Sequence, residues 1–415
     1  MNGLSVLRWV VLAAEIVVAL PIVYLAAITC AALIAQARRK RRMFAPPTDP
    51  PTFAFLIPAH DEEALIGTLL ASLKRQRYPA ERYTVCVVAD NCGDATAPIA
   101  EAAGAEVFER HDVTQRGKGY ALSWLLAELD RRGQRYDAYV VIDADSVVAP
   151  DFLAAMAAEL ARGARACQAQ NTVLNTTEAP STTLRWLAMT LMNHVRPLGR
   201  NAIGGSSNLS GNGMCLSRGL LERFPWRAFG LVEDYQYYLD IVAGGERVRY
   251  VPEAVVRSHM PTSFDQMRSQ DERWESGSPQ TSTGRIALRL IRSGLRRRRG
   301  VRWTPIAPLD AVAELLVPPL STLLAALLIV LAGAAAIGTV GERVFAAALL
   351  AGFALYVGSA FIMLRPEWAT YRALLYAPGY MAWKLWVQLV LKRRGQKRGE
   401  WVRTKRPDAV TPVGE

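Results

Sequence analysis

The segment Tyr139-Val-Val-Ile-Asp-Ala-Asp145 decides the fold of this chain, because it has the pattern of a buried strand that ends in two acids. Its continuous apolar run is typical of a strand covered on both faces. Upstream, short β-rich runs alternate with helical patterns. The β-rich runs are residues 52–57, 84–89 and 106–109. The helical patterns lie over about 63–76, from about 95, and over 120–132. This alternation predicts an α/β domain with a doubly wound, mainly parallel sheet.

Two further strands of the expected sheet also end in polar residues. The run at 52–57 leads into Pro58-Ala-His-Asp-Glu62, and the run at 84–89 leads into Asp90-Asn-Cys92. In an open α/β sheet, ligands bind where the strands end at their carboxyl edge. The side chains that we expect together at this edge are His60, Glu62, Asp90, Asp143 and Asp145.

Carboxylates gathered at one edge repel each other unless a ligand neutralises them. A Mg²⁺ or Mn²⁺ ion that bridges to a diphosphate is the usual solution, and we expect Asp145 to bind it. Asp90 is suited to a base or ribose, since a carboxylate accepts hydrogen bonds from a ring N–H or a sugar hydroxyl. For both acids the alternative is an Asx-turn that caps the next helix. His259 follows a short strand at 248–251 and could complete the metal shell, although a lone histidine is more often structural.

Glycines mark two places where the backbone could approach a ligand closely. In Arg116-Gly-Lys-Gly119 the glycines and Lys118 stand just before a helix N-terminus, an arrangement that suits a phosphate group. The glycines of Gly211-Asn-Gly213 allow close approach to a polar ligand or form ordinary turns.

A carboxylate pair, Glu233-Asp234, opens a helical stretch. The helix dipole stabilises acids at this position, which is a structural explanation for the pair. The pair also suits general-base chemistry, in which one carboxylate takes a proton and its neighbour tunes it.

Gln270, Arg273 and Trp274 stand at positions i, i+3 and i+4 and therefore share one helix face. An amide, a guanidinium and an indole on one face match a site that holds phosphate and stacks a sugar. The alternative is a surface helix with a buried tryptophan.

Three charge-free apolar stretches indicate an integral membrane protein, since each is about long enough to cross ~30 Å of hydrocarbon. They are Ile16–Ala35, Leu315–Ile337 and Val344–Leu364. Seventeen Lys and Arg residues lie in three clusters beside them, more than the net charge of +12. The clusters are residues 38–42, 296–299 and 392–406.

Nucleic acid is not an expected partner, because the rest of the chain is near neutral. The positive-inside rule places the large domain in the cytoplasm, and we expect a bacterial inner (plasma) membrane.

The chain therefore divides into five expected parts. An anchor with its basic flank (1–43) precedes the sheet domain (44–284), and an amphipathic segment (285–310) leads to two transmembrane helices (311–365). The amphipathic segment suits the headgroup region of a bilayer or is a plain solvated helix. Residues 374–391 are apolar but contain Pro378-Gly379 and Lys384, so the last part (366–415) is expected to hold an interfacial or re-entrant helix and a basic cytoplasmic tail.

Taken in order, these motifs resemble those of membrane-bound family 2 glycosyltransferases with the Q-x-x-R-W motif, the group that contains cellulose, chitin and hyaluronan synthases. The resemblance covers about residues 52–280 and the flanking spans. It implies a cytoplasmic GT-A domain with one transmembrane helix before it and two or three after it. It also implies a nucleotide-sugar donor, a Mg²⁺ or Mn²⁺ ion and inversion at the anomeric carbon.

The resemblance also implies roles for the residues that match its motifs. Asp234 is then the catalytic base beside Glu233, Asp145 is the metal ligand, and Trp274 lines the acceptor site. The donor-binding residues are then His60, Glu62, Asp90, Lys118, Asp143, Asp145, Gln270 and Arg273. Of these, Asp90 meets the base, and Lys118 and Arg273 meet the diphosphate.

Three functions remain open at this point. The first is a synthase that adds hexose or N-acetylhexosamine units to a growing polysaccharide or oligosaccharide. The donor that we expect for it is a UDP-sugar. The second is a single addition to a membrane lipid, because ceramide glucosyltransferases have a similar arrangement of spans and a related motif. The third is an inactive nucleotide-sugar sensor or scaffold, which would have no chemical reason to keep Asp145, Asp234 and Arg273 together.

Overall fold

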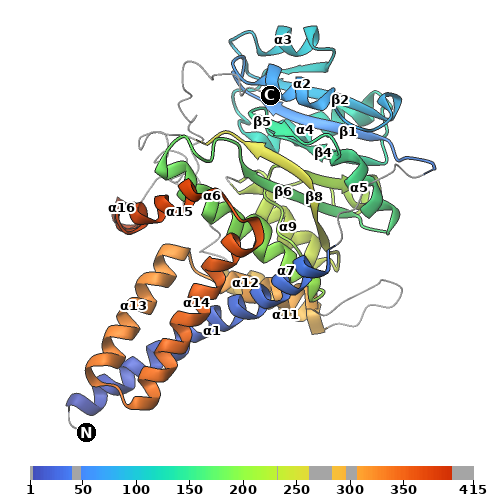
Figure 1. Cartoon of the computed structure of the whole chain (residues 1–415). Helices are drawn as coiled ribbons and strands as arrows, with labels where there is room; N and C mark the ends of the chain where they lie inside the picture. The colour runs from blue at the N-terminus through green and yellow to red at the C-terminus, as the bar shows by residue number, and fades with distance from the viewer. Residues whose placement is uncertain (1–2, 40–47, 231, 261–282, 296–305, 395–415) are drawn as a thin grey trace.

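The computed structural model describes residues 3–39, 48–230, 232–260, 283–295 and 306–394. A sheet domain lies at one end, and three long helices extend away from it in a bundle (Figure 1). The motif at 270–274 and the tail after residue 394 lie outside the described residues.

One eight-stranded sheet forms the centre of the domain, in the order β3-β2-β1-β4-β7-β6-β8-β5. Its first half is the parallel sheet that the sequence predicts, because β1 pairs in parallel with β2 and β4, and β2 with β3. β7 then runs antiparallel to both β4 and β6, while β8 is parallel to β6 and antiparallel to β5. The strands are β1 (Phe53–Ala59), β2 (Tyr83–Asp90), β3 (Glu106–Arg110), β4 (Ala138–Val141), β5 (Ser146–Val148), β6 (Ala166–Val173), β7 (Met214–Ser217) and β8 (Val248–Ser258).

Helices cover both faces of the sheet. Successive side chains of a strand point to opposite faces, so each strand contributes to two hydrophobic cores, one under each layer of helices. Phe53, Phe55 and Ile57 of β1 belong to one core and Ala54 and Leu56 to the other. The first core includes α2 (Ile66–Leu73), α3 (Thr96–Ala102) and α5 (Phe152–Ala161). The second includes α4 (Lys118–Arg131), α8 (Arg218–Arg223), α9 (Glu233–Ala243), α11 (Thr283–Leu295) and α12 (Ile306–Leu315).

A third core joins the domain to the long helices. It packs α1 (Gly3–Arg38), α13 (Leu320–Ile337) and α14 (Val340–Leu364) against α6 (Pro180–Thr190), the π-helical turn η2 (Leu191–Val195) and α7 (Arg196–Ala202). Each of the three long helices is apolar and long enough to cross a membrane, one before the domain and two after it. This confirms the predicted plan of spans.

The second span begins later than predicted. Residues 311–315 belong to α12, whose Ala311 is buried in the domain core, and α13 begins only at Leu320. Pro318 and Pro319 separate the two helices, because proline cannot donate the backbone hydrogen bond that a continuous helix would need. The prediction of a span from Leu315 was therefore wrong by about one helical turn.

The amphipathic segment forms α11, which packs against α9 and α12. Leu290 is fully buried there, while Leu288 and Leu295 stay exposed. The domain itself therefore occupies part of the apolar face that the sequence assigns to lipid headgroups.

The segment after the last span is helical, in α15 (Trp368–Ala373), the 3₁₀ turn η3 (Leu374–Tyr376) and α16 (Ala377–Arg394). Pro378 is the second residue of α16, a position where a missing N–H costs nothing, so it does not interrupt the helix. α15 packs against α6, while α16 contacts α13. Figure 1 shows both helices at the end of the spans nearest the sheet domain.

Candidate active site

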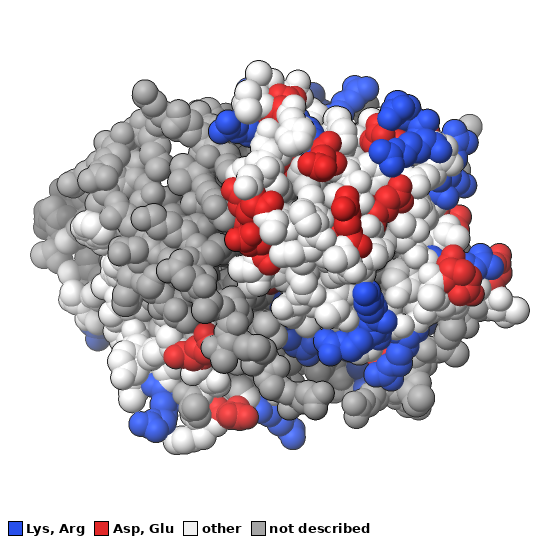
Figure 2. All heavy atoms as spheres, turned by 90° about the horizontal axis from the view of Figure 1, so that it is seen from above, with Lys and Arg blue, Asp and Glu red and all other residues white. Residues whose placement is uncertain are grey.

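The strand ends bring the expected side chains to one edge of the sheet. β1 and β2 end side by side, with Ala59 opposite Ala89, and β3 ends with Arg110 opposite Asp90. Seen from above, Asp and Glu side chains lie across the middle of the described face, with most Lys and Arg side chains toward its edges (Figure 2).

Asp90 lies in a buried ion pair that the sequence analysis missed. Its Oδ1 atom is 2.6 Å from Nη1 of Arg110, whose Nη2 atom donates to Asp112 and to the carbonyl of Gln115. Burial raises the pKa of Asp90 above its ordinary value, although the guanidinium opposes this shift. Arg110 could have been found from its position, since it ends the strand next to the one that Asp90 ends.

His60 is held against the same strand end. Its Nδ1 atom lies 2.7 Å from the carbonyl oxygen of Asp90, and because a carbonyl only accepts, Nδ1 carries the proton. Glu62 lies on the loop into α2, where its backbone N–H donates to Thr96 Oγ1. The structure thus places His60 at Asp90 and uses the backbone of Glu62 to connect two neighbouring loops.

Lys118, the first residue of α4, is the centre of a second cluster. Its ammonium donates to Asp143 and, at 2.5 Å, to the carbonyl oxygen of Gly211. A Cβ atom on Gly211 would lie 3.4 Å from Lys118 Nζ and 3.1 Å from Asp234 Oδ2, so Gly211 lies between these two side chains. Its φ of +73° also favours glycine. The fold therefore gathers Lys118, Asp143 and Asp234 from three elements.

Electrostatics in this cluster favour a base at work near neutral pH. Burial raises the pKa of Asp234 above its ordinary value and that of Glu233 to about 7, although Lys118 lowers both. The pKa of Lys118 is raised, because the neighbouring carboxylates Asp143, Glu233 and Asp234 outweigh the effect of burial. A carboxylate of raised pKa beside a fixed cation is suited to accept a proton.

The side chain of Asn212 connects the Lys118 cluster to the strands that precede the candidate metal ligands, Asp145 and His259. The sequence did not predict this role. Its Oδ1 atom accepts from the backbone N–H of Asp143 at 3.2 Å, and its Nδ2 atom donates to Ser146 and Ser258. Ser146 of β5 pairs with Ser258 of β8 in antiparallel register.

Asp145 and His259 are the next residues outward from that pair, so both leave the ladder at the same end. Asp145 Oδ1 accepts a 3.4 Å hydrogen bond from Ser146, and His259 Nε2 lies 3.8 Å from Glu178 Oε2. A carboxylate and an imidazole at one strand end form a donor set that Mn²⁺ or Mg²⁺ can use together with phosphate oxygens.

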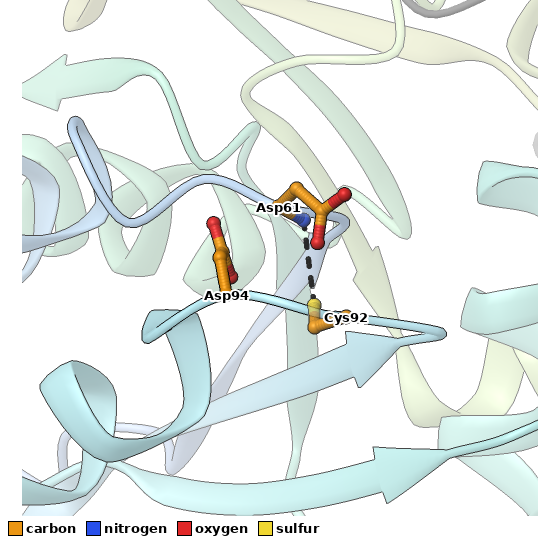
Figure 3. A group of neighbouring side chains, drawn as sticks. All are labelled: Asp61, Cys92 and Asp94. Atoms are coloured by element: carbon orange, nitrogen blue, oxygen red, sulfur yellow. Dashed lines mark hydrogen bonds between the residues drawn. The ribbon is translucent and has the colours of Figure 1, made fainter.

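Within the described part of the chain, one group of three potential ligands lies closer together, formed by Asp61, Cys92 and Asp94 (Figure 3). Its atoms already support the two loops, since Asp61 Oδ1 accepts from the N–H of Gly93 and Asp94 Oδ1 from that of Thr96. The Asp61 N–H in turn donates to Cys92 Sγ at 3.4 Å. We read this group as a link between the loops that follow β1 and β2.

Gln270, Arg273 and Trp274 lie outside the described residues, so their roles remain predictions.

Comparisons with known proteins show the family of the chain. The sequence model of the family described as Glycosyltransferase like family 2 matches residues 50–277, more than half of the chain. The "Probable glycosyltransferase YdaM" of Bacillus subtilis (strain 168) is 25% identical over 243 residues, 55% of this chain and 55% of YdaM. The chain thus spans about half the length of the curated relative that it matches.

One solved structure shows the same fold. The mannosyltransferase PcManGT from Pyrobaculum calidifontis, in complex with GDP-Man and Mn²⁺, has a TM-score of 0.50 at 20% identity, covering 87% of this chain and 98% of that one. S. aureus TarS 1-349 in complex with UDP-GlcNAc has a TM-score of 0.43 at 13% identity, covering 76% and 93%. The domain has a GT-A-like α/β fold, and the family match spans the sheet and the acidic edge described above: the chain belongs to glycosyltransferase family 2.

Proposed function

We propose that the chain is a membrane-anchored, inverting glycosyltransferase whose domain faces the cytoplasm. It transfers a sugar from a nucleotide diphosphate donor to a glycan at the membrane. We propose a UDP-sugar as this donor. The observation that carries this proposal is the cluster of Lys118, Asp143 and Asp234 around Gly211, in which the partly buried carboxylate of Asp234, with its raised pKa, lies near a fixed cation.

The transfer needs a base for the acceptor hydroxyl and positive charge close to the departing diphosphate. Asp234 accepts the proton of the acceptor hydroxyl while its oxygen forms the new bond to the anomeric carbon. The bond between that carbon and the diphosphate breaks in line, which inverts the configuration. Lys118 neutralises the charge that grows on the departing diphosphate, together with Arg273 if the resemblance to Q-x-x-R-W enzymes holds.

Asp145 and His259 are the residues that would hold a divalent cation. When bound, such a cation would neutralise phosphate charge as a Lewis acid. The complex of PcManGT with GDP-Man and Mn²⁺ supports this part of the proposal by analogy of fold only.

A second acceptor class, a membrane lipid, is favoured by how the spans pack. A Cβ atom on Gly333 would lie 3.0 Å from Val11 Cγ2, and one on Gly352 would lie 3.1 Å from Ile22 Cγ2. The three described spans are thus in close contact, whereas a polymer channel would need polar space between helices.

The experiment is a product analysis with the full chain in lipid nanodiscs. A panel of UDP- and GDP-sugars is offered with Mn²⁺ and either membrane lipid extract or short oligosaccharides, and nucleoside diphosphate release and product mass are measured. A ladder of masses supports a polymerising synthase, and a single increment on a lipid supports the lipid acceptor. Absence of diphosphate release with every donor would refute the function.

A further inference from the structure

A buried arginine stands where the catalytic domain meets the membrane helices. Arg200 of α7 has 0% of its surface exposed. A buried charge is tolerated only when it is paired and its hydrogen-bonding groups are satisfied. All three guanidinium nitrogens donate, Nε to Asp310 at 2.8 Å, Nη1 to Asn208 at 2.6 Å and Nη2 to the hydroxyl of Tyr238 at 2.9 Å.

These three partners lie on three different elements. Asp310 belongs to α12, Tyr238 to α9, and Asn208 to the loop before β7 (residues 204–213). Asp310 also accepts from the hydroxyl of Tyr24, on the membrane helix α1, at 2.8 Å. Arg200 therefore connects α1 and α12 with two segments of the catalytic domain.

The loop is built to receive this ion pair. The backbone N–H of Ser206 donates to Asp310 Oδ2 at 3.1 Å. A Cβ atom on Gly205 would lie only 2.4 Å from the same oxygen, so a glycine is required for the carboxylate to approach the backbone.

Both segments that Arg200 holds lead directly to the active site. The loop continues to Gly211, whose carbonyl accepts from Lys118 and whose backbone lies against Asp234. On α9, Tyr238 is four residues after Asp234, so the two side chains lie on the same helix face one turn apart. The position of Asp234 is thus constrained from its own helix and from the loop in front of it.

Arg196, one turn earlier on α7, shows what a purely structural arginine would look like here. It is also buried, and it donates to Glu314 of α12 at 3.0 Å and to Tyr356 of α14 at 2.7 Å. Within the described part of the chain, its hydrogen bonds join α7 to α12 and α14, and none of them goes to α9 or to the 204–213 loop.

We propose that Arg200 is a positioning residue for sugar transfer: through Tyr238 and the 204–213 loop it holds Asp234 in place and ties it to the membrane helices. This inference rests on the proposed function, because it assumes that Asp234 acts on the acceptor. A base displaced by about 1 Å loses on the order of 100-fold in rate without loss of substrate binding.

The kinetic test compares Arg200→Gln and Tyr238→Phe with the matched control Arg196→Gln. We expect Arg200→Gln and Tyr238→Phe to lower kcat by about tenfold or more, with the donor KM within about threefold. Arg196→Gln should lower the apparent Tm, as Arg200→Gln does. Its kcat, calculated per mole of protein that still binds nucleotide, should stay within about threefold of the wild-type value. If kcat fell in proportion to the apparent Tm in all three variants, including Arg196→Gln, the proposal would be overturned.

A second readout does not depend on turnover. Amide hydrogen exchange of the full chain in nanodiscs should be faster at residues 204–213 and 232–243 in Arg200→Gln and Tyr238→Phe, and unchanged there in Arg196→Gln. Equal exchange in all variants would refute the positioning role. If the wild type transferred no sugar from any donor, the proposed function would fail, while this comparison would still decide whether Arg200 orders α9 and the loop.

Discussion

At the scale of single residues, Asp234 carries the strongest prediction. Asp234→Asn keeps the shape of the side chain but removes its ability to accept a proton. We expect kcat to fall by a factor of ~100 to 10,000 while nucleotide-sugar affinity stays within a few-fold. Steady-state kinetics and calorimetric titration with the donor measure the two quantities.

The matched control is Asp240→Asn, on the same helix, where the side chain is partly exposed and pairs with Arg289. It should leave both quantities unchanged. Turnover of Asp234→Asn close to that of the wild type would show that another group is the base.

The pH dependence of the reaction follows from the same site. Asp234 must be ionised to take a proton, and burial raises its pKa and raises that of the adjoining Glu233 to about 7. Activity is therefore lost as pH falls through the raised pKa of Asp234, so we expect the acidic limb of kcat at a higher pH than the ordinary aspartate pKa of about 3.9 would give.

Glu233→Gln removes one negative charge from the pair. Ionisation of Asp234 then becomes easier, and the acidic limb should move to lower pH. The profile is measured at saturating donor. An acidic limb near pH 4 in the wild type would contradict the assignment of the base.

Asp145 is expected to control binding of a divalent cation. Asp145→Ala should weaken the Mn²⁺-dependent part of UDP binding by about tenfold or more, since carboxylate and phosphate oxygens form the shell such ions prefer. Calorimetry of UDP binding with Mn²⁺ or EDTA measures this without turnover. Asp61→Ala is the comparison, because Asp61 belongs to the other group of potential ligands. If Asp61→Ala removed the Mn²⁺ effect and Asp145→Ala did not, the metal site would lie there instead.

At the scale of elements, the contact of α1 with α7 depends on a glycine. A Cβ atom on Gly199 would lie 2.0 Å from the carbonyl oxygen of Ile28, so Gly199→Ala must push the two helices apart. We expect a loss of about 1–3 kcal/mol, seen as a lower apparent Tm.

Gly358→Ala on α14 is the control, since a Cβ there would meet nothing within 4 Å. Alanine favours helix over glycine, so its Tm should stay equal or rise slightly. Equal destabilisation by both variants would show that the α1–α7 contact is not as close as described.

Element boundaries show where local patterns succeed. The helical stretch that Glu233-Asp234 is predicted to open is α9, which begins at Glu233, because its acids favour the N-terminus and its apolar side chains recur at helical spacing. β6 and β7 were not predicted. β6 contains Gln168 and Asn171, so it lacks the continuous apolar run that predicts a buried strand. Gln168 is buried because Asn212 and Ser210 satisfy its amide, contacts made 42 to 44 residues away.

At the scale of the whole molecule, the membrane topology can be tested at the C-terminus. We predict that residues after Leu391, most of them outside the described part, are cytoplasmic and that the helix over 374–391 does not cross the bilayer. Moving the eight positive charges of the tail outward opposes the orientation rule. Lys384 and the neighbouring tryptophans are stable at the headgroup level.

Cysteine labelling decides this, with Val410→Cys in a chain whose five native cysteines are replaced. A membrane-impermeant maleimide should label position 410 only after the cells are opened. Labelling of intact cells would mean a fourth span and an external tail.

The sequence by itself determined the first half of the sheet, the acids at its carboxyl edge, the three spans and the helix that carries Asp234. These follow from residue periodicity and from the rule that parallel strands end at a common edge, which need only local information. The tertiary structure alone decided that Arg110 pairs with Asp90, that Gly211 lies between Lys118 and Asp234, and that Arg200 ties the site to α1. Such contacts join groups 20 to 286 positions apart. Which partners meet is therefore fixed by how the helices and strands pack and not by the pattern of any one segment.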